Sequence, residues 1–215
     1  MLDAWGQHPA VLAALAEASD ALGEDLAQLI HDGPKEALAL TTNTQPVMLV
    51  SAVAAYRAWL AEGGAVPSVV AGHSLGEFTA LVVNGTLPFE EALKLVSIRA
   101  LAMQKACELA PSTMAAVLAL ADEKVEQICA EVLAETGEVV VPANYNCPGQ
   151  LVISGSIKGI EIACEKMKEA GAKRALVLPV GGAFHSPLMQ PAKEELAAAI
   201  EATTFNTPIC PVYQN

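Results

Sequence analysis

The stretch Val69-Val70-Ala71-Gly72-His73-Ser74-Leu75-Gly76-Glu77 decides the fold of this chain. A β-branched run at 66–70 leads into it, and a helical pattern of small residues at 77–84 follows it. This order predicts a strand, a sharp turn with Ser74 at its apex, and a helix. Glycines two positions either side of Ser74 would let the backbone turn tightly and let the helix pack close to the strand.

The predicted turn suits Ser74 to nucleophilic chemistry. At a helix N-terminus, unpaired N–H groups and the helix dipole favour developing negative charge. The Leu75 N–H is then the natural donor to a tetrahedral oxyanion. The alternative is a glycine-rich turn whose serine only caps the helix, and the pattern G-x-S-x-G does not by itself separate the two. The strand before it and the helix after it favour the nucleophile.

Composition indicates a soluble α/β protein. Of the 215 residues, 53% are hydrophobic but only 4% are aromatic, so the apolar mass is Ala, Val and Leu, which suits helices packed closely on a buried sheet. This length allows one sizeable core, or a core with a small inserted subdomain. No apolar run approaches the roughly 18 residues of a membrane span. The start, Met1 to Trp5, lacks the basic and apolar regions of a signal peptide.

The net charge and the cysteine spacing exclude several classes of partner and site. The formal net charge is −12, which argues against nucleic acid or an anionic membrane as a partner. The five cysteines are far apart and form no C-x-x-C pair, so we expect reduced thiols in the cytoplasm, with neither a metal site nor a disulfide framework.

Helices are predicted on both sides of the turn. Two short helices fall between residues 8 and 31, and another covers 46–60 with Thr44 as its N-cap. A long helix covers 89–108. After residue 180 we predict one more helix, at 191–202, and a strand at 209–213.

The region 112–179 has a different pattern, which reads strand, helix, strand, strand, helix, strand. The strands are expected at 114–120, 139–144, 150–154 and 174–179, and the helices at 122–134, with Asp122 as N-cap, and 157–170. This order is typical of a ferredoxin-like unit. We therefore predict a ferredoxin-like small subdomain, residues 112–179, inserted into a larger α/β body formed by residues 1–111 and 180–215.

A serine nucleophile needs a base, and His185 is the best placed of the four histidines. It lies in a Gly/Pro-rich loop directly after the last predicted subdomain strand, and loops that leave rigid elements often carry catalytic groups. Equally open is a structural role in which His185 bonds to backbone. His8 and His31 lie among polar residues of the N-terminal region, and His73 is expected to point away from Ser74.

The carboxylates do not suggest a full triad. Asp122 is the only aspartate between Ser74 and His185, and none follows His185. Glutamates in this interval stay open as a third member, but they are expected on solvated helix faces. A Ser–His dyad, with a carbonyl group orienting the imidazole, is therefore more economical than the Ser–Asp–His order of α/β-hydrolases. This weighs against an ordinary esterase.

Arg99 is the remaining candidate, in the apolar helical segment from Leu95 to Met103. No acidic residue lies three or four positions away, and a guanidinium in apolar surroundings is costly unless it meets an anion. Its planar fork matches a carboxylate with two parallel hydrogen bonds. The alternative is an arginine that extends its head into solvent at the helix surface.

These residues together resemble the malonyl-CoA:acyl carrier protein transacylase family, the acyltransferases of fatty acid synthesis. The matching segments occur in order along nearly the whole chain: Gln45-Pro46, Ala71 to Glu77, Arg99 with Met103-Gln104, Asn144 to Gln150, Gly171 to Leu176, and Ala183 to Met189. The resemblance implies an α/β-hydrolase-like body with an inserted ferredoxin-like subdomain, and an active site in the cleft between them.

The resemblance also implies roles for individual residues. Ser74 would be the nucleophile, Leu75 an oxyanion donor through its backbone, His185 the general acid and base, and Arg99 the clamp on the malonyl carboxylate. Met103 and Phe184 would line the acyl site. No cofactor is implied: malonyl-CoA is the substrate, and the accepting phosphopantetheine thiol belongs to the partner, an acyl carrier protein.

Relative to the family, the chain starts just after a Pro-Gly-Gln-Gly segment and stops before a Gly-Pro-Gly loop and the last sheet strands. We therefore expect exposed apolar surface where those strands would pack. Two other functions stay open at this stage: a serine thioesterase or esterase, and a non-catalytic remnant.

Overall fold

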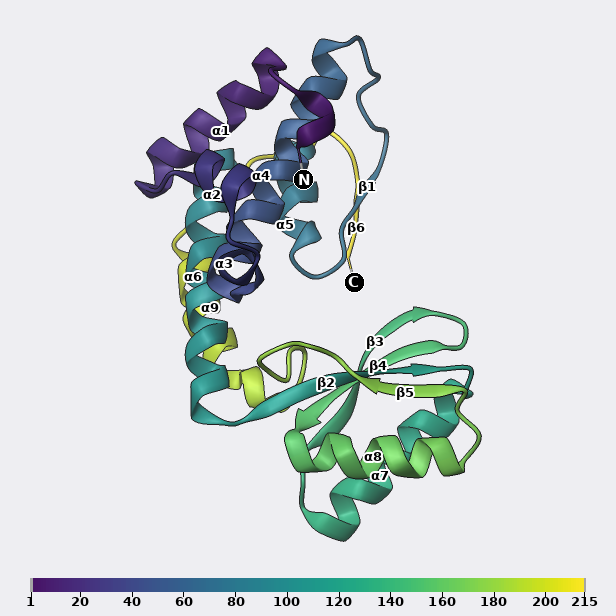
Figure 1. The fold of residues 1–215 in the computed structure, drawn as a ribbon. Coiled ribbons are helices and arrows are strands. Elements are labelled where there is room, and N and C mark those ends of the chain that lie inside the picture. Colours follow the sequence, from purple (N-terminus) through teal and green to yellow (C-terminus); the bar gives the residue numbers. More distant parts are fainter. Residues whose placement is uncertain (1, 215) are drawn as a thin grey trace. The chain divides into compact units, whose positions relative to one another are not determined.

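The computed structural model describes residues 2–214, and its internal contacts divide the chain into two units (Figure 1). The first consists of Met1–Leu101 with Glu195–Asn215, and the second of Ala102–Glu194. The predicted subdomain, 112–179, falls inside the second unit, which also contains the end of a long helix and the loop after the last subdomain strand. The subdomain boundaries at 112 and 179 remain a prediction.

Helices make up most of the first unit. They are the short 3₁₀ helix η1 (Asp3–Trp5), α1 (Pro9–Leu22), α2 (Leu26–Asp32), α3 (Lys35–Ala39), α4 (Thr41–Ala61), α5 (Gly76–Val83), the start of α6 (Phe89–Leu109) and the second half of α9 (Gln190–Glu201). Proline occupies the first turn of α1, where its missing N–H costs nothing, and His8 Nδ1 accepts from the Ala10 N–H as the N-cap. The core of this unit lies among α1, α4 and α6, around Val11, Leu15, Leu49, Val53, Leu93 and Val96.

Helix α4 corrects one prediction. It begins at Thr41 rather than Pro46, so Pro46 lies inside it, and the N-cap is Leu40 without a side-chain bond. Thr44 is not a cap: its hydroxyl donates to the carbonyl of Leu40 at 3.0 Å and also to that of Leu38. The proline was a misleading start signal because it is the sixth residue of the helix, beyond the first turn, where it removes the hydrogen bond to the Thr42 carbonyl without ending the helix.

Only a short parallel strand pair forms in the first unit. β1 (Val70–Ala71) pairs with β6 (Val212–Tyr213), so the strands predicted at 66–70 and 209–213 are shorter than expected. Strands depend on neighbours for their backbone bonds, and this pair has no others among the described residues. Val66, Val69 and Ile209 beside it are exposed.

The second unit has the predicted ferredoxin-like topology. Its elements are β2 (Ser112–Leu118), α7 (Asp122–Thr136), β3 (Val140–Cys147), β4 (Gln150–Ser156), α8 (Ile157–Glu169) and β5 (Arg174–Val177). The sheet has the order β3-β4-β2-β5, and every neighbouring pair is antiparallel. Both helices cover one face of the sheet (Figure 1).

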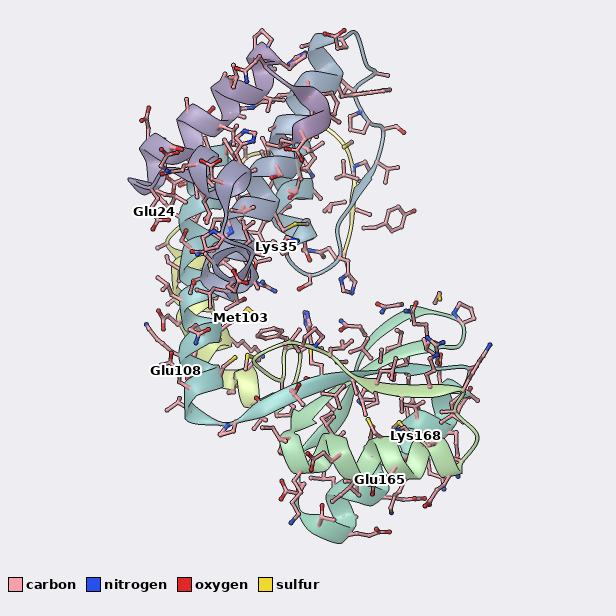
Figure 2. All side chains as sticks on the ribbon, viewed as in Figure 1. Glu24, Lys35, Met103, Glu108, Glu165 and Lys168 are labelled. Carbon is pink, nitrogen blue, oxygen red and sulfur yellow. The ribbon has the colours of Figure 1, made fainter. Side chains whose placement is uncertain are left out.

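Helix α8 shows why these elements pack as they do. Its buried residues, Ile160, Ala163, Cys164 and Met167, recur at helical spacing and face the sheet. Glu165 and Lys168 point outward from the same helix (Figure 2). α7 is similar, except that its N-cap is Ala121 and Asp122 is its first residue, so the predicted cap at Asp122 is wrong by one position.

The chain leaves the sheet through a loop, the 3₁₀ helix η2 (Pro187–Met189) and α9 (Gln190–Glu201), close to the helix predicted at 191–202. No helix within residues 2–214 is both long enough and apolar enough to cross a membrane. Nor do three or more His, Cys, Asp or Glu side chains of this part of the chain cluster in a way that could hold a metal ion.

Candidate active site

The predicted turn is present in the first unit, between β1 and α5. Ser74 is at its apex with a φ of 53°, a left-handed conformation that costs a serine about 1–3 kcal/mol and persists only where the surroundings impose it. Backbone bonds close the turn: the Gly76 N–H donates to the His73 carbonyl at 2.9 Å, and the Glu77 N–H to the Ser74 carbonyl at 3.2 Å. These backbone bonds therefore fix the main chain at Ser74.

The two glycines of the turn are not equivalent. A Cβ atom on Gly72 would lie 2.0 Å from the backbone carbon of Gly76, so no side chain fits there. A Cβ atom on Gly76 would meet nothing within 4 Å. The expected close approach of helix and strand is real, but it depends on Gly72 alone.

Arg99 reaches the Ser74 hydroxyl from helix α6. Its Nη2 donates to Ser74 Oγ at 3.0 Å, and its Nη1 donates to Gln45 Oε1. Gln45 lies on α4, is 5% exposed, and donates through Nε2 to the Thr41 hydroxyl at 3.0 Å. Three separate elements, α4, α6 and the turn, thus converge on one hydrogen-bonded group.

The guanidinium of Arg99 is partly buried among neutral partners. No carboxylate in residues 2–214 forms an ion pair with it. Desolvation by burial lowers the pKa of Arg99 from its ordinary value, although an arginine stays charged across the physiological range. A buried cation without a carboxylate partner is costly, so this group is suited to receive an anion. Arg99 is not an arginine that merely extends into solvent.

The Leu75 N–H is available as a donor. Leu75 is the N-cap of α5, and no acceptor for its N–H occurs in the described part of the chain. It belongs to the first N–H groups of the helix, which have no intrahelical partner. The group therefore meets the requirement for an oxyanion donor next to Ser74.

His185 belongs to the second unit, in the loop between β5 and η2. Its φ is 58°, so it shares the left-handed conformation of Ser74, and its side chain is exposed. The loop closes on itself beyond it: Ser186 Oγ donates to the Ala183 carbonyl at 2.7 Å and accepts from the Leu188 N–H at 3.2 Å.

Met103 and Phe184 lie in one apolar cluster of the second unit. Met103, on α6 (Figure 2), is buried with Ala102, Ala106, Met189 and Ala192, and Phe184 and Cys107 pack against this group. A Cβ atom on Gly182 would lie 2.1 Å from Cys107 Sγ, so the loop that carries Phe184 and His185 rests directly on α6.

The structure thus brings Ser74, Leu75 and Arg99 together in one unit, and Met103 and Phe184 together with the His185 loop in the other. Sequence reasoning missed the part played by Gln45, which appeared only as part of a matching segment. A buried glutamine reveals its partner only through the fold. His31 is exposed, and its Nδ1 lies 4.0 Å from Asp3. The His8 side chain is only 17% exposed: it caps α1 and contacts Glu62 at 3.1 Å, so His8 is not the solvated surface residue that its polar neighbours suggest.

Comparisons with known proteins agree on one family. The family model described as acyl transferase domain matches residues 7–215. The malonyl CoA-acyl carrier protein transacylase of Escherichia coli K12 is 45% identical over 215 residues, which is all of this chain and 69% of that protein. The Bacillus subtilis protein of the same name is 42% identical over 211 residues, 98% of this chain and 66% of that protein.

Solved structures give the same result. The acyl-carrier-protein S-malonyltransferase of Burkholderia pseudomallei has a TM-score of 0.94 at 52% identity, covering 98% of this chain and 68% of that one. A malonyl-transacylase solved in complex with its type II PKS acyl-carrier protein has a TM-score of 0.94 at 43% identity, with coverages of 99% and 68%. The chain therefore spans about two thirds of the length of these relatives.

Proposed function

Since this chain belongs to the acyl transferase family and, within it, to the malonyl-CoA:acyl carrier protein transacylases, we infer that it is an enzyme that transfers a malonyl group. The donor is malonyl-CoA, and the acceptor is the phosphopantetheine thiol of an acyl carrier protein. The reaction belongs to fatty acid biosynthesis. The phosphopantetheine is carried by the partner, so we propose that this chain needs no cofactor of its own. We also propose a cytoplasmic location, as expected from the widely spaced cysteines.

The first half-reaction acylates Ser74. His185 takes the proton of the Ser74 hydroxyl as the oxygen attacks the thioester carbonyl, and the Leu75 N–H donates to the oxyanion of the tetrahedral intermediate. The intermediate collapses, the carbon–sulfur bond breaks, and His185 returns the proton to the departing coenzyme A thiolate. Ser74 then carries the malonyl group as an ester.

The second half-reaction runs the same steps in the opposite sense. The phosphopantetheine thiol gives its proton to His185 and attacks the malonyl ester, and the Leu75 N–H again receives the negative charge. The Ser74 oxygen leaves and takes the proton back from His185. Both halves require the His185 imidazole to come within hydrogen-bonding reach of Ser74 Oγ.

The observation that carries this proposal is the guanidinium of Arg99 at 3.0 Å from the nucleophilic oxygen. In a malonyl thioester a single methylene separates the attacked carbonyl from the free carboxylate. An acyl group bonded to Ser74 Oγ therefore brings its carboxylate close to Arg99, where it can replace the serine hydroxyl as the acceptor. A paired carboxylate offsets the cost of burying the cation.

Intact-mass spectrometry tests the proposal. After incubation with malonyl-CoA alone, the protein should gain the mass of one malonyl group, and a holo acyl carrier protein added afterwards should remove it and become malonylated. Ser74→Ala should gain no mass, and His185→Ala should acylate at least about 10²-fold more slowly because it lacks the base. If malonate were released at the same rate with and without the carrier, the enzyme would be a hydrolase. If no adduct formed at all, the chain would be non-catalytic.

A further inference from the structure

Buried hydroxyl groups of the second unit's sheet hold the loop that carries His185. Ser154 Oγ, on strand β4, donates to the Phe184 carbonyl at 2.6 Å. Ser112 Oγ, on the neighbouring strand β2, accepts from the Ala183 N–H at 3.0 Å. The two residues that precede His185 are therefore each bonded to a side chain of the sheet.

The Ser112 bond is buried and the Ser154 bond is partly buried. Ser154 is 0% exposed, Ser112 is 6% exposed, and Ala183 is fully buried. A backbone group buried in this way needs a partner, because water cannot replace one that is removed. Ser154 and Ser112 thus provide the hydrogen-bond partners of the Phe184 carbonyl and the Ala183 N–H.

The same bonds lie beside a strained residue. His185 has a φ of 58°, and a left-handed histidine persists only where its surroundings impose that conformation. Ser154 and Ser112 fix the chain just before His185, while the Ser186 hydroxyl, bonded to the Ala183 carbonyl, closes the loop just after it. The backbone at His185 has little freedom between these points.

We propose that Ser154, assisted by Ser112, is a positioning residue that sets the place of the His185 imidazole for proton transfer. The proposal rests on the proposed function, in which His185 is the general acid and base. Ser154 does not contact the reacting atoms in this scheme. It acts through the Phe184 carbonyl and the conformation of the next residue.

Removing the hydroxyl should lower kcat more than it raises KM for malonyl-CoA, because a displaced base slows the chemical step while the Arg99 contact with the carboxylate lies outside the loop. Displacements of about 1 Å in a catalytic group cost up to about 100-fold in rate. We expect kcat of Ser154→Ala to fall about 10- to 100-fold, and that of Ser112→Ala to fall less because the carbonyl contact remains.

Ser156→Ala is the matched control. Ser156 lies two residues further along β4, and its hydroxyl accepts from the Gly159 N–H at 3.1 Å as the N-cap of α8 and donates to Glu138 Oε2 at 2.7 Å. None of its bonds involves the His185 loop. This variant should lose thermal stability like Ser154→Ala but keep the kcat of the unmodified protein. Equal kcat values for the two variants would overturn the proposal.

A second measurement does not depend on activity. In ¹H–¹³C NMR spectra the imidazole signal of His185, assigned by its absence in His185→Gln, should shift or broaden in Ser154→Ala and Ser112→Ala but not in Ser156→Ala. An unchanged signal in both loop variants would also overturn the proposal, and Ser112→Ala keeps the test usable if Ser154→Ala does not fold. The proposed function fails separately, if His185→Ala itself retains full activity.

Discussion

The turn that carries Ser74 and the loop that carries His185 place their residues in the same left-handed conformation by different means. At the turn the constraint is backbone against backbone: Gly72 approaches the main chain of Gly76 so closely that no Cβ atom fits. At the loop the constraint comes from side chains, namely two serine hydroxyls and the sulfur of Cys107. A contact between two backbones cannot be adjusted by changing a side chain, whereas a side-chain contact can be.

The largest expected effect concerns the turn that carries Ser74, where one backbone segment contacts another. Gly72→Ala should destabilise the first unit by about 3 kcal/mol or more, because the new methyl group would overlap the Gly76 backbone. Gly76→Ala is the control and should be neutral or stabilising by about 0.5 kcal/mol, since nothing lies within 4 Å and alanine favours a helix. Urea denaturation measures both. Equal losses of stability in Gly72→Ala and Gly76→Ala would mean that the turn can adjust to an added methyl group, as the loop can.

The next effect concerns the side chains that meet at the turn. Arg99→Ala should lower kcat/KM for malonyl-CoA about 100-fold, the value of about 2.7 kcal/mol expected for a charge-assisted pair. The rate with acetyl-CoA should change little, because that substrate has no carboxylate. Arg99→Lys keeps the charge without the planar fork, so its kcat/KM for malonyl-CoA should lie between those of the unmodified protein and Arg99→Ala. An unchanged malonyl-to-acetyl ratio would remove Arg99 from this role.

The third prediction concerns the loop that carries His185, where side chains provide the constraint. Gly182→Ala should cost about 2 kcal/mol, because its methyl group meets Cys107 Sγ. Cys107→Ala removes that sulfur, so the double variant should be more stable than the sum of the single variants predicts, by about 1 kcal/mol in a double-mutant cycle. Additive losses would show that the Gly182 contact is as rigid as that of Gly72.

The smallest expected effect on stability concerns an exposed hydrogen bond of the second unit. Tyr145 Oη donates to Glu126 Oε1 at 2.6 Å, and this bond raises the pKa of Tyr145 to about 12. The raised pKa favours the neutral phenol in the folded protein. Its contribution to stability is therefore complete below about pH 10, the unfolded value, and is lost as the pH rises towards 12.

Glu126→Gln should lower this pKa towards its ordinary value, because the charged acceptor is the largest cause of the shift. An absorbance titration of tyrosinate can follow the change, with Tyr145→Phe to identify the signal. The melting temperature at pH 7 should change little, because the group is on the surface. A large loss at neutral pH would mean that exposed hydrogen bonds position this sheet as strongly as the buried serines do.

The fold of the second unit was predictable because its information is local. Each strand and helix between Ser112 and Val177 has its own period and its own turn residues, and six such elements in order admit few topologies. The strand expected at 66–70 was less predictable. Its β-branched residues are suited to a strand, but only Val70–Ala71 finds a partner, at the other end of the chain.

The candidate site was predictable in part for the same reason. Ser74 and Leu75 belong to one short motif, and Arg99 stood out because its helix offers no nearby acid. The roles of Gln45 and Ser154 depend on contacts across 54 and 30 positions of sequence, and an isolated glutamine or serine gives no sign of them. A short motif does not reveal which side chains, distant in sequence, hold it in place in the folded protein.

Helix α6 carries two of the candidate residues at a fixed spacing. Arg99 and Met103 lie one turn apart on it, and an α-helix rises about 1.5 Å per residue, so their separation along the axis is close to 6 Å. Arg99 belongs to the first unit and Met103 to the second, yet one unbroken helix joins them. Helix geometry therefore fixes the axial spacing of these two positions.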